Sequence, residues 1–259
     1  MQQGDFTALA KDYINRTGYS ARVLKHLAAY LGAGQESFVV ADVGAGTGKL
    51  TEGLIRLGLR GYAVEPNHAM RAEGMRLNDG RGFQWREGSG ENTTLPDGSV
   101  DWLLMASSFH WTDPQRSLPE FQRVLKPGGY LTVLWNPRDL EKNPLHQRIE
   151  ARIHEMVPGV QRVSSGSSRY TEGIEQTLQA GGLFDNLIFL EAPHEAHMSR
   201  ERYLGAWRSV NDIQAQAGPD RFNAVLRMIE EQVSGLEEII VPYRTRAWTV
   251  QSSKGRHSV

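Results

Sequence analysis

The residue pattern with the most chemical content is a glycine-rich turn that follows a short apolar run. The segment Val40-Ala-Asp-Val-Gly-Ala-Gly-Thr-Gly-Lys-Leu50 passes from small and β-branched residues through three glycines into a helical pattern of leucines. A buried strand that enters a helix through glycines brings backbone N–H groups close to a ligand. The segment therefore predicts a ligand-binding loop.

The spacing of the glycines separates three classes of cofactor. A phosphate-binding P-loop needs Gly-x-x-x-x-Gly-Lys-Ser/Thr, whereas the position five before Gly48 is Val43 and Lys49 is followed by Leu50. The dinucleotide fingerprint Gly-x-Gly-x-x-Gly would need a third glycine at position 49. The pattern that remains is Gly-x-Gly-x-Gly, with Asp42 two residues ahead of the first glycine.

A carboxylate stands at the end of the next predicted strand. Glu65 follows Gly44 by twenty-one positions. In doubly wound nucleotide-binding folds an acid at this place binds both ribose hydroxyls, because its two oxygens match a vicinal diol. We therefore interpret Glu65 as a ribose ligand, with a solvated surface acid as the alternative.

Strands and helices alternate around these residues. The predicted strands are Phe38–Val43, Gly61–Glu65, Phe83–Glu87, Val100–Ala106 and Tyr130–Trp135, and the predicted helices are a segment 5–32 broken at Gly18-Tyr19, then Lys49–Leu57, His68–Leu77 and Pro119–Val124. This order predicts a parallel sheet covered by helices. Past Pro137 the order changes, with predicted helices Pro144–Met156, Glu172–Gln179 and Ser199 to about Ser234, a polar loop Val163–Tyr170, and strands Leu187–Glu191 and Glu238–Thr249.

Four motifs in order resemble the class I S-adenosylmethionine (AdoMet) dependent methyltransferases. They are the glycine loop, Glu65, the segment from Gly88 to Asp101, and Lys126-Pro-Gly-Gly129. The resemblance covers residues 36–136. Ala10-x-x-Tyr13 before Gly18-Tyr19, together with Phe109-His-Trp111, is similar to the small-molecule branch that holds the ubiquinone-pathway and trans-aconitate methyltransferases.

The resemblance implies a fold, a domain plan and a cofactor. The fold is α/β, a doubly wound, mostly parallel seven-stranded sheet (Rossmann-like methyltransferase fold) with an antiparallel last strand and a helical cap. A single domain would comprise a lid (1–35), an AdoMet-binding core (36–140), a variable cap with the final strands (141–250) and a flexible tail (251–259). The implied ligands of AdoMet, and of its product S-adenosyl-L-homocysteine (AdoHcy), are Asp42, Gly44, Ala45, Gly46, Gly48, Glu65, Pro66, Ser89, Gly90, Glu91, Asn92 and Ser107.

The acceptor side has weaker signals. His110 is the best candidate for a general base, because imidazole titrates near neutrality, although a carboxylate acceptor would need no base and the ring could simply pack. Tyr13, Tyr19 and Trp111 are candidates for the pocket wall or for the core. Tyr203, Trp207 and Arg208 share one predicted helix and are candidates for the acceptor side. Arg208, Arg244 and Arg246 suit an anionic acceptor, or pair with acids.

Composition bounds the remaining choices. The chain has 259 residues, a formal net charge of −1 and no cysteine, so we expect no bulk attraction to nucleic acid and a cytoplasmic location. We expect no metal at His194-x-x-His197, no membrane span, and a monomer or homodimer. The leading hypothesis is methyl transfer to a small-molecule acceptor, most readily O-methylation of a hydroxyl or carboxylate. The alternatives are a tRNA or rRNA methyltransferase and a non-catalytic AdoMet-fold binding protein.

Overall fold

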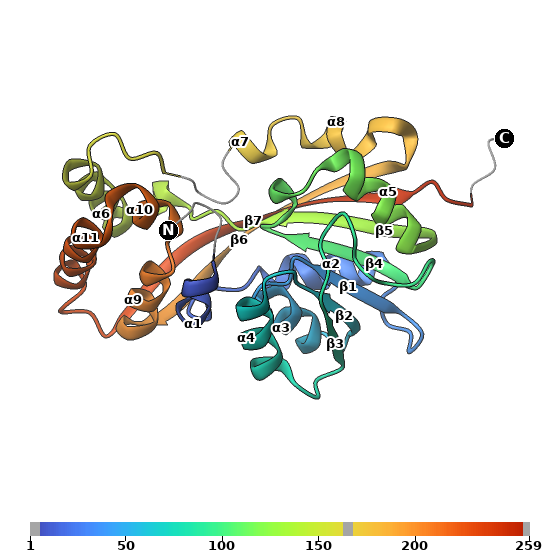
Figure 1. Cartoon of the computed structure of the whole chain (residues 1–259), viewed down its shortest axis with the longest axis horizontal. Helices are drawn as coiled ribbons and strands as arrows, with labels where there is room; N and C mark the ends of the chain where they lie inside the picture. Colours follow the sequence, from blue (N-terminus) through green and yellow to red (C-terminus); the bar gives the residue numbers. More distant parts are fainter. Residues whose placement is uncertain (1–5, 163–167, 256–259) are drawn as a thin grey trace. The chain divides into compact units, whose positions relative to one another are not determined.

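The described strands form one seven-stranded sheet (Figure 1). The computed structural model describes residues 6–162 and 168–255. The strand order is β3-β2-β1-β4-β5-β7-β6. The strands are β1 Val39–Val43, β2 Arg60–Val64, β3 Phe83–Arg86, β4 Val100–Ala106, β5 Leu125–Trp135, β6 Phe184–Ser199 and β7 Glu238–Ser252. The pairs from β3 to β5 are parallel, and β7 runs antiparallel to β5.

Helices fill most of the connections between the strands. The α-helices are α1 Ala10–Tyr13, α2 Ala21–Tyr30, α3 Lys49–Arg56, α4 His68–Asn78, α5 Pro114–Val124, α6 Pro144–Met156, α7 Ser168–Thr171, α8 Ile174–Gln179, α9 Arg200–Arg208, α10 Asn211–Ala217 and α11 Pro219–Gln232. Short 3₁₀ turns are η1 Thr7–Leu9, η2 Phe109–Trp111, η3 Leu140–Lys142 and η4 Ala180–Gly182. None of these described helices is both long and apolar enough to cross a lipid bilayer.

Contacts divide the chain into two compact units. The sheet unit comprises Gly18–Asn136, Ser165–Ala192 and Thr245–Val259, and the helical unit comprises Met1–Thr17, Pro137–Ser164 and Pro193–Arg244. Strands β6 and β7 contribute residues to both units. Among the described residues, two buried clusters of apolar side chains lie in the sheet unit and one lies in the helical unit.

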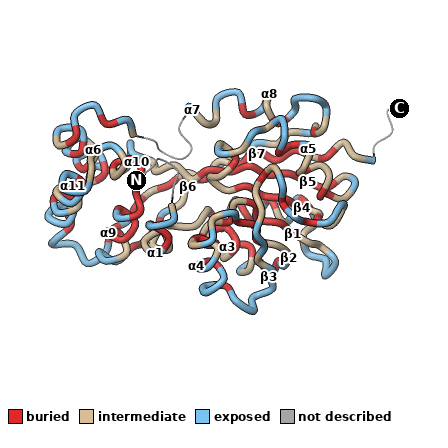
Figure 2. The backbone as a smooth tube through the Cα atoms, in the orientation of Figure 1, coloured by how far each residue is buried: buried red, intermediate tan, exposed pale blue. Residues whose placement is uncertain are grey.

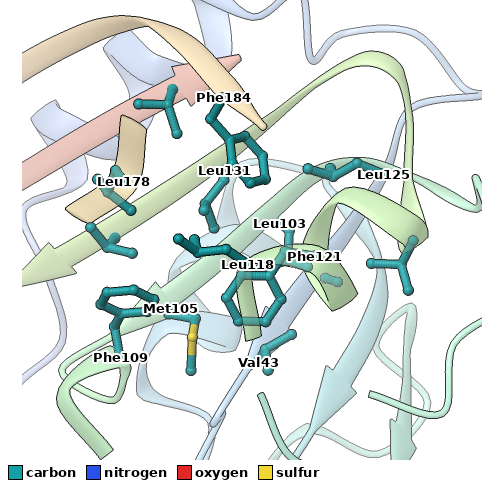
Figure 3. Packing of buried hydrophobic residues seen from close by; sticks show 14 of the residues in the cluster. Val43, Leu103, Met105, Phe109, Leu118, Phe121, Leu125, Leu131, Leu178 and Phe184 are labelled. Carbon is teal, nitrogen blue, oxygen red and sulfur yellow. The ribbon is translucent and has the colours of Figure 1, made fainter. Parts of the chain in front are cut away.

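In the sheet unit, alternate residues of each central strand enter different clusters. Leu103 and Met105 of β4 pack with residues of α5 and α8, whereas Trp102 and Leu104 pack with residues of α2 and α3. Figure 3 shows the first cluster, in which Leu118 and Phe121 of α5 meet the sheet residues. The central strands are buried on both faces (Figure 2), which explains their nearly continuous apolar sequence.

The helical unit has a core of its own. Ile149 and Ile153 of α6, Trp207 of α9 and Val225 and Ile229 of α11 are fully buried there. These positions repeat at helical spacing, so each helix presents one apolar face to the others.

The predicted fold class is confirmed, including the seven strands and the antiparallel final strand. Helix α6 and strand β4 have the predicted bounds. The predicted helical stretch from Ser199 to about Ser234 is helical, and it is divided into three helices, α9, α10 and α11. Gly218 has a φ of 75°, and Pro219 after it lacks a backbone N–H, so the chain ends one helix and starts another there.

Other predicted bounds need correction. The first helical segment is shorter, with only η1 and α1 before the break and α2 after it. Helix α5 starts at Pro114, since the Asp113 side chain accepts a hydrogen bond from the Gln115 backbone N–H and caps the helix. Strand β6 extends far beyond Leu187–Glu191. The predicted loop Val163–Tyr170 falls partly outside the described residues, and its last three residues begin α7.

Candidate functional site

The glycine loop lies at the carboxyl end of β1. Gly44, Gly46 and Gly48 have φ values of 71°, 58° and 82°, in the left-handed region that side-chain-bearing residues avoid. The backbone N–H groups of Gly44 and Ala45 both donate to the carbonyl of Val64, at 2.8 and 3.0 Å. The loop is therefore fastened to the end of β2.

Glu65 fastens the same loop through its carboxylate. Its Oε2 accepts from the Gly46 backbone N–H at 2.8 Å, and its Oε1 accepts from the Asn67 backbone N–H at 2.9 Å. The residue is only 7% exposed. Burial raises the pKa of this carboxyl, while the two backbone hydrogen bonds and the charge of Arg71 oppose the rise. The structure thus brings Gly46 and Glu65 together.

Asp42 has a different setting from Glu65. It is fully buried in β1, and its Oδ2 accepts from the Thr51 hydroxyl at 2.6 Å. Its Oδ1 has no hydrogen-bond partner among the described residues. Burial raises the pKa of Asp42 to about 7. Its side chain joins β1 to α3, a contact for which the sequence carried no signal beyond the spacing of nine residues.

The segment after β3 is held by its own polar groups. The Ser89 hydroxyl accepts from the backbone N–H groups of Glu91 and Asn92, at 3.2 and 3.3 Å. Glu91 Oε1 accepts from the Asp113 backbone N–H at 2.9 Å. At Gly90 an added Cβ would lie 2.5 Å from Thr112 Cγ2. The side chains of Ser89 and Glu91 therefore shape this loop.

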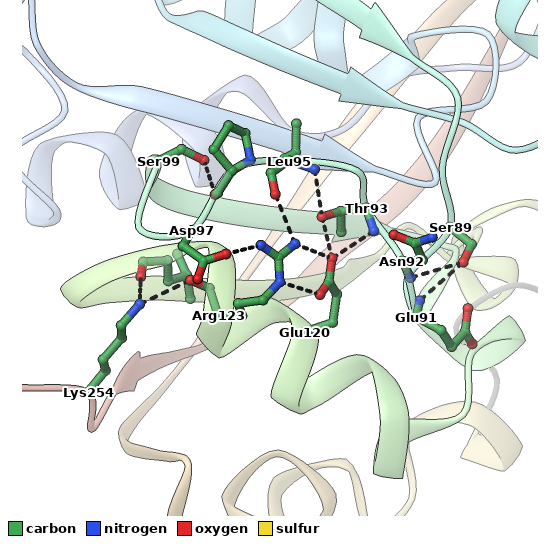
Figure 4. A network of polar contacts seen from close by, with 12 residues as sticks. Ser89, Glu91, Asn92, Thr93, Leu95, Asp97, Ser99, Glu120, Arg123 and Lys254 are labelled. Atoms are coloured by element: carbon green, nitrogen blue, oxygen red, sulfur yellow. Dashed lines mark hydrogen bonds and ion pairs between the residues drawn. The ribbon is translucent and has the colours of Figure 1, made fainter.

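A network of charged groups continues the same segment (Figure 4). Thr93 donates from both its backbone N–H and its hydroxyl to Glu120 Oε1, at 2.8 and 2.6 Å. Arg123 donates to both oxygens of Glu120 at 2.8 Å and also to the carbonyl of Leu95 at 2.9 Å. It pairs with Asp97 as well. Two side chains of helix α5, Glu120 and Arg123, thereby hold the segment that contains Thr93 and Leu95.

The end of β4 meets the end of β1 and an aromatic residue. Ser107 has a φ of 53°, which is unusual for a residue with a side chain. Its backbone N–H donates to the carbonyl of Leu134 at 2.8 Å. Its hydroxyl accepts from Tyr19 Oη at 3.1 Å. Ser108 donates to the carbonyl of Val43 at 3.1 Å. The structure thus joins the predicted residues Tyr19 and Ser107, and adds Ser108.

Two residues that sequence reasoning missed hold the segment before α2. Asn136, directly after β5, donates from Nδ2 to the Gly18 carbonyl at 3.0 Å. The Thr245 hydroxyl donates to Asn136 Oδ1 at 2.7 Å and accepts from the Ser20 backbone N–H at 2.9 Å. A polar residue at the end of a predicted parallel strand was the available signal for Asn136.

His110 lies in η2 among aromatic rings. Its ring centre is 4.2 Å from that of Tyr170 and 4.9 Å from that of Trp111. Trp135 Nε1 donates to His110 Nδ1 at 3.3 Å. Because an indole nitrogen only donates, Nδ1 must accept, and the neutral ring carries its proton on Nε2. Burial lowers the pKa of His110 to about 4, so the ring is neutral at pH 7.

Part of the chain is similar in sequence to known methyltransferases. Residues 41–133 match the model of a family described as a methyltransferase domain. An uncharacterized methyltransferase of Mycobacterium tuberculosis is 45% identical over 100 residues, which cover 39% of this chain and 40% of that protein. The chain thus matches well under half the length of this curated relative.

Solved structures give the fold. One from Anaeromyxobacter dehalogenans, assigned as a type II methyltransferase, superposes with a TM-score of 0.63 at 20% identity, covering 90% of this chain and 97% of that one. The chain has the Rossmann-like methyltransferase fold. Phosphoethanolamine N-methyltransferase 2 of Haemonchus contortus, in complex with S-adenosyl-L-methionine, gives a TM-score of 0.54 at 13% identity, covering 96% of this chain and 57% of that one.

In this methyltransferase fold the predicted cofactor residues gather at the carboxyl ends of parallel strands. Gly44 follows β1, Glu65 and the exposed Pro66 follow β2, and Ser107 follows β4. Ligands of open α/β sheets bind at such ends. Trp111, in the same unit, is 53% exposed beside His110.

The remaining acceptor candidates have partners within their own units. In the helical unit, Arg208 pairs with Asp12 at 3.0 Å and Arg244 with Asp139 at 3.2 Å. In the sheet unit, Arg246 pairs with Glu191 at 3.0 Å. These contacts match the alternative that the arginines pair with acids.

The aromatic candidates of the helical unit differ in burial. The Tyr13 ring lies 4.2 Å from the Arg16 guanidinium carbon. Tyr203 and Trp207 are core residues, 2% and 0% exposed.

The histidine pair His194-x-x-His197 is the remaining candidate from the sequence. His197 contacts Glu238 at 3.2 Å, and no group of three or more metal-binding side chains was found in the described part of the chain.

We predict that Gly44→Ala destabilises the fold. An added Cβ would lie 2.6 Å from Ser108 Cβ, and the left-handed backbone is itself unfavourable for alanine. The expected loss in free energy of unfolding is about 2–4 kcal/mol. Urea denaturation measures it, with Gly34→Ala as control because a Cβ there meets nothing within 4 Å. Equal effects of the two substitutions would contradict the prediction.

Proposed function

We propose that this chain is an AdoMet-dependent methyltransferase that acts on a small-molecule acceptor, most readily at an oxygen. The observation that carries the proposal is the hydrogen bond from the Gly46 N–H to the Glu65 carboxylate. It sets a glycine loop beside a buried acid at the ends of β1 and β2, where nucleotide-like ligands bind in such sheets.

The residues present fit the cofactor. Each Glu65 oxygen accepts one backbone N–H and keeps a lone pair, so the carboxylate has one site for each hydroxyl of a ribose. The loop Gly44–Gly48 would hold the amino-acid part, and Ser89–Asn92 the adenine. Ser107 would lie beside the reacting group. When bound, AdoMet supplies a methyl group activated by a sulfonium, and the H. contortus structure of the same fold contains it.

His110 is proposed to bind the acceptor as a hydrogen-bond donor. Its Nδ1 already accepts from Trp135, so Nε2–H is the group left to offer. A donor orients an acceptor oxygen, and a carboxylate acceptor needs no proton removed. The contacts of the ring thus support donation better than the base role that the sequence suggested.

Substitutions at His110 separate these two roles. We expect His110→Gln, which keeps an N–H at the end of the side chain, to retain most of kcat/KM, and His110→Phe to lose about 10- to 100-fold. The kcat/KM of the wild type should not fall as pH decreases through 6.5, because the ring is neutral down to about pH 4. Steady-state kinetics from pH 5 to 9 provide the measurement. Equal losses in both variants, with a kcat/KM that falls as pH decreases through 6.5, would support a base.

The charge of the chain supports a small acceptor over a nucleic acid. A formal net charge of −1 offers no general attraction to phosphate backbones. A gel shift with bulk tRNA tests the alternative, because a shift that disappears only at high salt would favour an RNA substrate.

Calorimetry with AdoHcy tests the proposed function. We expect saturable binding with one ligand per chain, and transfer of a labelled methyl group from AdoMet to an acceptor found by screening hydroxyl and carboxylate compounds. Folded protein that binds neither AdoMet nor AdoHcy would rule the proposal out.

A further inference from the structure

Two side chains hold the peptide groups on both sides of Tyr19. Asn136 Nδ2 donates to the Gly18 carbonyl at 3.0 Å, and the Thr245 hydroxyl accepts from the Ser20 backbone N–H at 2.9 Å. The same hydroxyl donates to Asn136 Oδ1 at 2.7 Å. All five residues belong to the sheet unit. These three hydrogen bonds, which we call the Tyr19 clamp, fix the backbone before and after Tyr19.

The directions of the hydrogen bonds in the clamp agree with one another. A hydroxyl has one proton, which Thr245 gives to Asn136, so its lone pairs remain for the Ser20 N–H. The amide of Asn136 presents its oxygen to Thr245 and its NH₂ group to the Gly18 carbonyl. Ser20 and Thr245 are 1% and 0% exposed. Removal of one partner therefore leaves buried polar groups unpaired, which costs more than the bond itself contributes.

The register of the sheet explains why Asn136 and Thr245 meet. Strands β5 and β7 are antiparallel, and Trp135 pairs with Arg246 at the end of β5. Asn136 follows β5 directly, and Thr245 precedes Arg246 in β7, so the two residues continue the same register by one position. The clamp thus lies at the carboxyl end of β5, the edge of an open α/β sheet at which ligands bind.

The residue held by the clamp reaches the proposed cofactor site. Tyr19 Oη donates to Ser107 Oγ at 3.1 Å, just beyond the end of β4. Gly18 lies beside the glycine loop, since an added Cβ would be 3.4 Å from the carbonyl of Lys49, the first residue of α3. The segment Gly18–Ser20 therefore contacts the end of β4 and the start of the helix that follows the glycine loop.

We propose that Asn136 and Thr245 are positioning residues for the cofactor, which hold the backbone around Tyr19 and so place its phenol against Ser107. This inference rests on the proposed function, because that function assigns Ser107 and the glycine loop to AdoMet. Neither Asn136 nor Thr245 is assigned a contact with the cofactor. They act through Tyr19, since a binding residue is only as well placed as the groups that hold it. With the clamp intact, Tyr19 is ordered before the cofactor binds, and binding does not have to order it.

Substitutions of Thr245 test the clamp by calorimetry with AdoHcy. Thr245→Val has nearly the same shape and lacks the hydroxyl, so the Ser20 N–H and Asn136 Oδ1 lose this partner. We expect it to weaken binding about tenfold. Thr245→Ser keeps the hydroxyl and should bind within about threefold of the wild type. If Thr245→Val does not fold, Asn136→Ala, at a half-buried position, should give a similar loss.

A matched control lies on the same strand. Thr249 of β7 is 1% exposed, and its hydroxyl shares a hydrogen bond with that of Thr132 at 2.8 Å. Thr249→Val also removes a buried hydroxyl from β7, but it leaves the Tyr19 clamp intact. It should keep the AdoHcy affinity within about twofold of the wild type, while urea denaturation records its loss of stability. Equal weakening of binding by Thr245→Val and Thr249→Val would overturn the proposal.

A combined variant shows whether Thr245 acts through Tyr19. Tyr19→Phe removes the hydroxyl that bonds Ser107 and should weaken AdoHcy binding about 3- to 10-fold. If Thr245 positions this hydroxyl, the double variant should bind no more than about twofold more weakly than the weaker single variant. Losses that multiply would show two independent contributions and would overturn the positioning role.

The wild type separates this inference from the proposed function. A folded wild type that binds no AdoHcy would overturn both. If the wild type binds AdoHcy and Thr245→Val binds it with equal affinity, the positioning role is overturned and the proposed function stands.

Discussion

Glu65→Gln is expected to weaken AdoHcy binding about 100-fold or more, because two hydrogen bonds to a charged acceptor are lost or weakened. The carboxylate accepts from Gly46 and Asn67 and keeps one lone pair on each oxygen. An amide has only one oxygen, so its NH₂ group would face one backbone N–H and lack the charge. The substitution therefore acts on the loop and on the proposed diol site together.

A control acid stands at the end of the neighbouring strand. Glu87 directly follows β3, its side chain is 76% exposed, and it pairs with Arg71. Glu87→Gln should leave AdoHcy binding within about threefold of the wild type, because an exposed ion pair contributes little. Calorimetry gives the affinities, and urea denaturation shows that both variants fold. Similar affinities in the wild type and Glu65→Gln would contradict the ribose assignment while leaving AdoMet binding itself testable.

The pH dependence of binding gives a second measurement on the same residue. Burial raises the pKa of Glu65. Protonation removes the charge that accepts the hydroxyls, so AdoHcy affinity should fall as pH decreases through this raised pKa. The decline should begin at a higher pH than an ordinary glutamate would give, and it should be absent in Glu65→Gln.

The free energy of unfolding of the wild type is expected to decrease more than that of Asp42→Asn as pH rises from 4 to 8. The pKa of Asp42 is 3.8 as its ordinary value and about 7 in the folded chain, because burial opposes the charged form. The folded state therefore binds more protons than the unfolded state between these values. The stabilisation is complete below pH 3.8 and is lost as pH rises through about 7, a change of about 4 kcal/mol at most.

The variants isolate this contribution from other titrating groups. Asp42→Asn has no charge to bury, and its NH₂ group, placed where Oδ1 has no partner, costs a roughly constant amount at every pH. Asp79→Asn makes the same chemical change at an exposed position. Urea denaturation at pH 4.5, 6 and 8 should give a steeper decline for the wild type and Asp79→Asn than for Asp42→Asn. Equal slopes in all three would show that Asp42 ionises normally.

Local patterns were sufficient to predict a parallel sheet covered by helices, whereas the seven strands and the antiparallel last strand were implied by the family resemblance. A glycine-rich turn, an acid at a strand end and alternating strand and helix segments are features of short stretches, and the structure has each of them at or close to the predicted positions. The division of the helical stretch from Ser199 to about Ser234 also has a local cause, since Gly218-Pro219 is a helix break.

Contacts between distant residues could not be derived in this way. Ser20 and Thr245 are 225 positions apart, and Thr245 and Asn136 are 109 apart. The pairing of Trp135 with His110 decides which ring nitrogen carries the proton, and no spacing in the chain indicates it. Burial decides whether an apolar helix face lines a ligand or enters the core, because both faces have the same sequence pattern. Trp207 was a candidate for the acceptor side, and its 0% exposure places it in the core.

The sequence by itself thus determined the class of sheet, the glycine loop and the strand end at which Glu65 stands, because backbone conformation and apolar periodicity act over a few residues. Only the tertiary structure decided that Glu65 bonds Gly46, that Asp42 is buried against Thr51 and that the proton of the neutral His110 ring lies on Nε2. Those outcomes depend on which side chains folding brings within hydrogen-bond distance and removes from water.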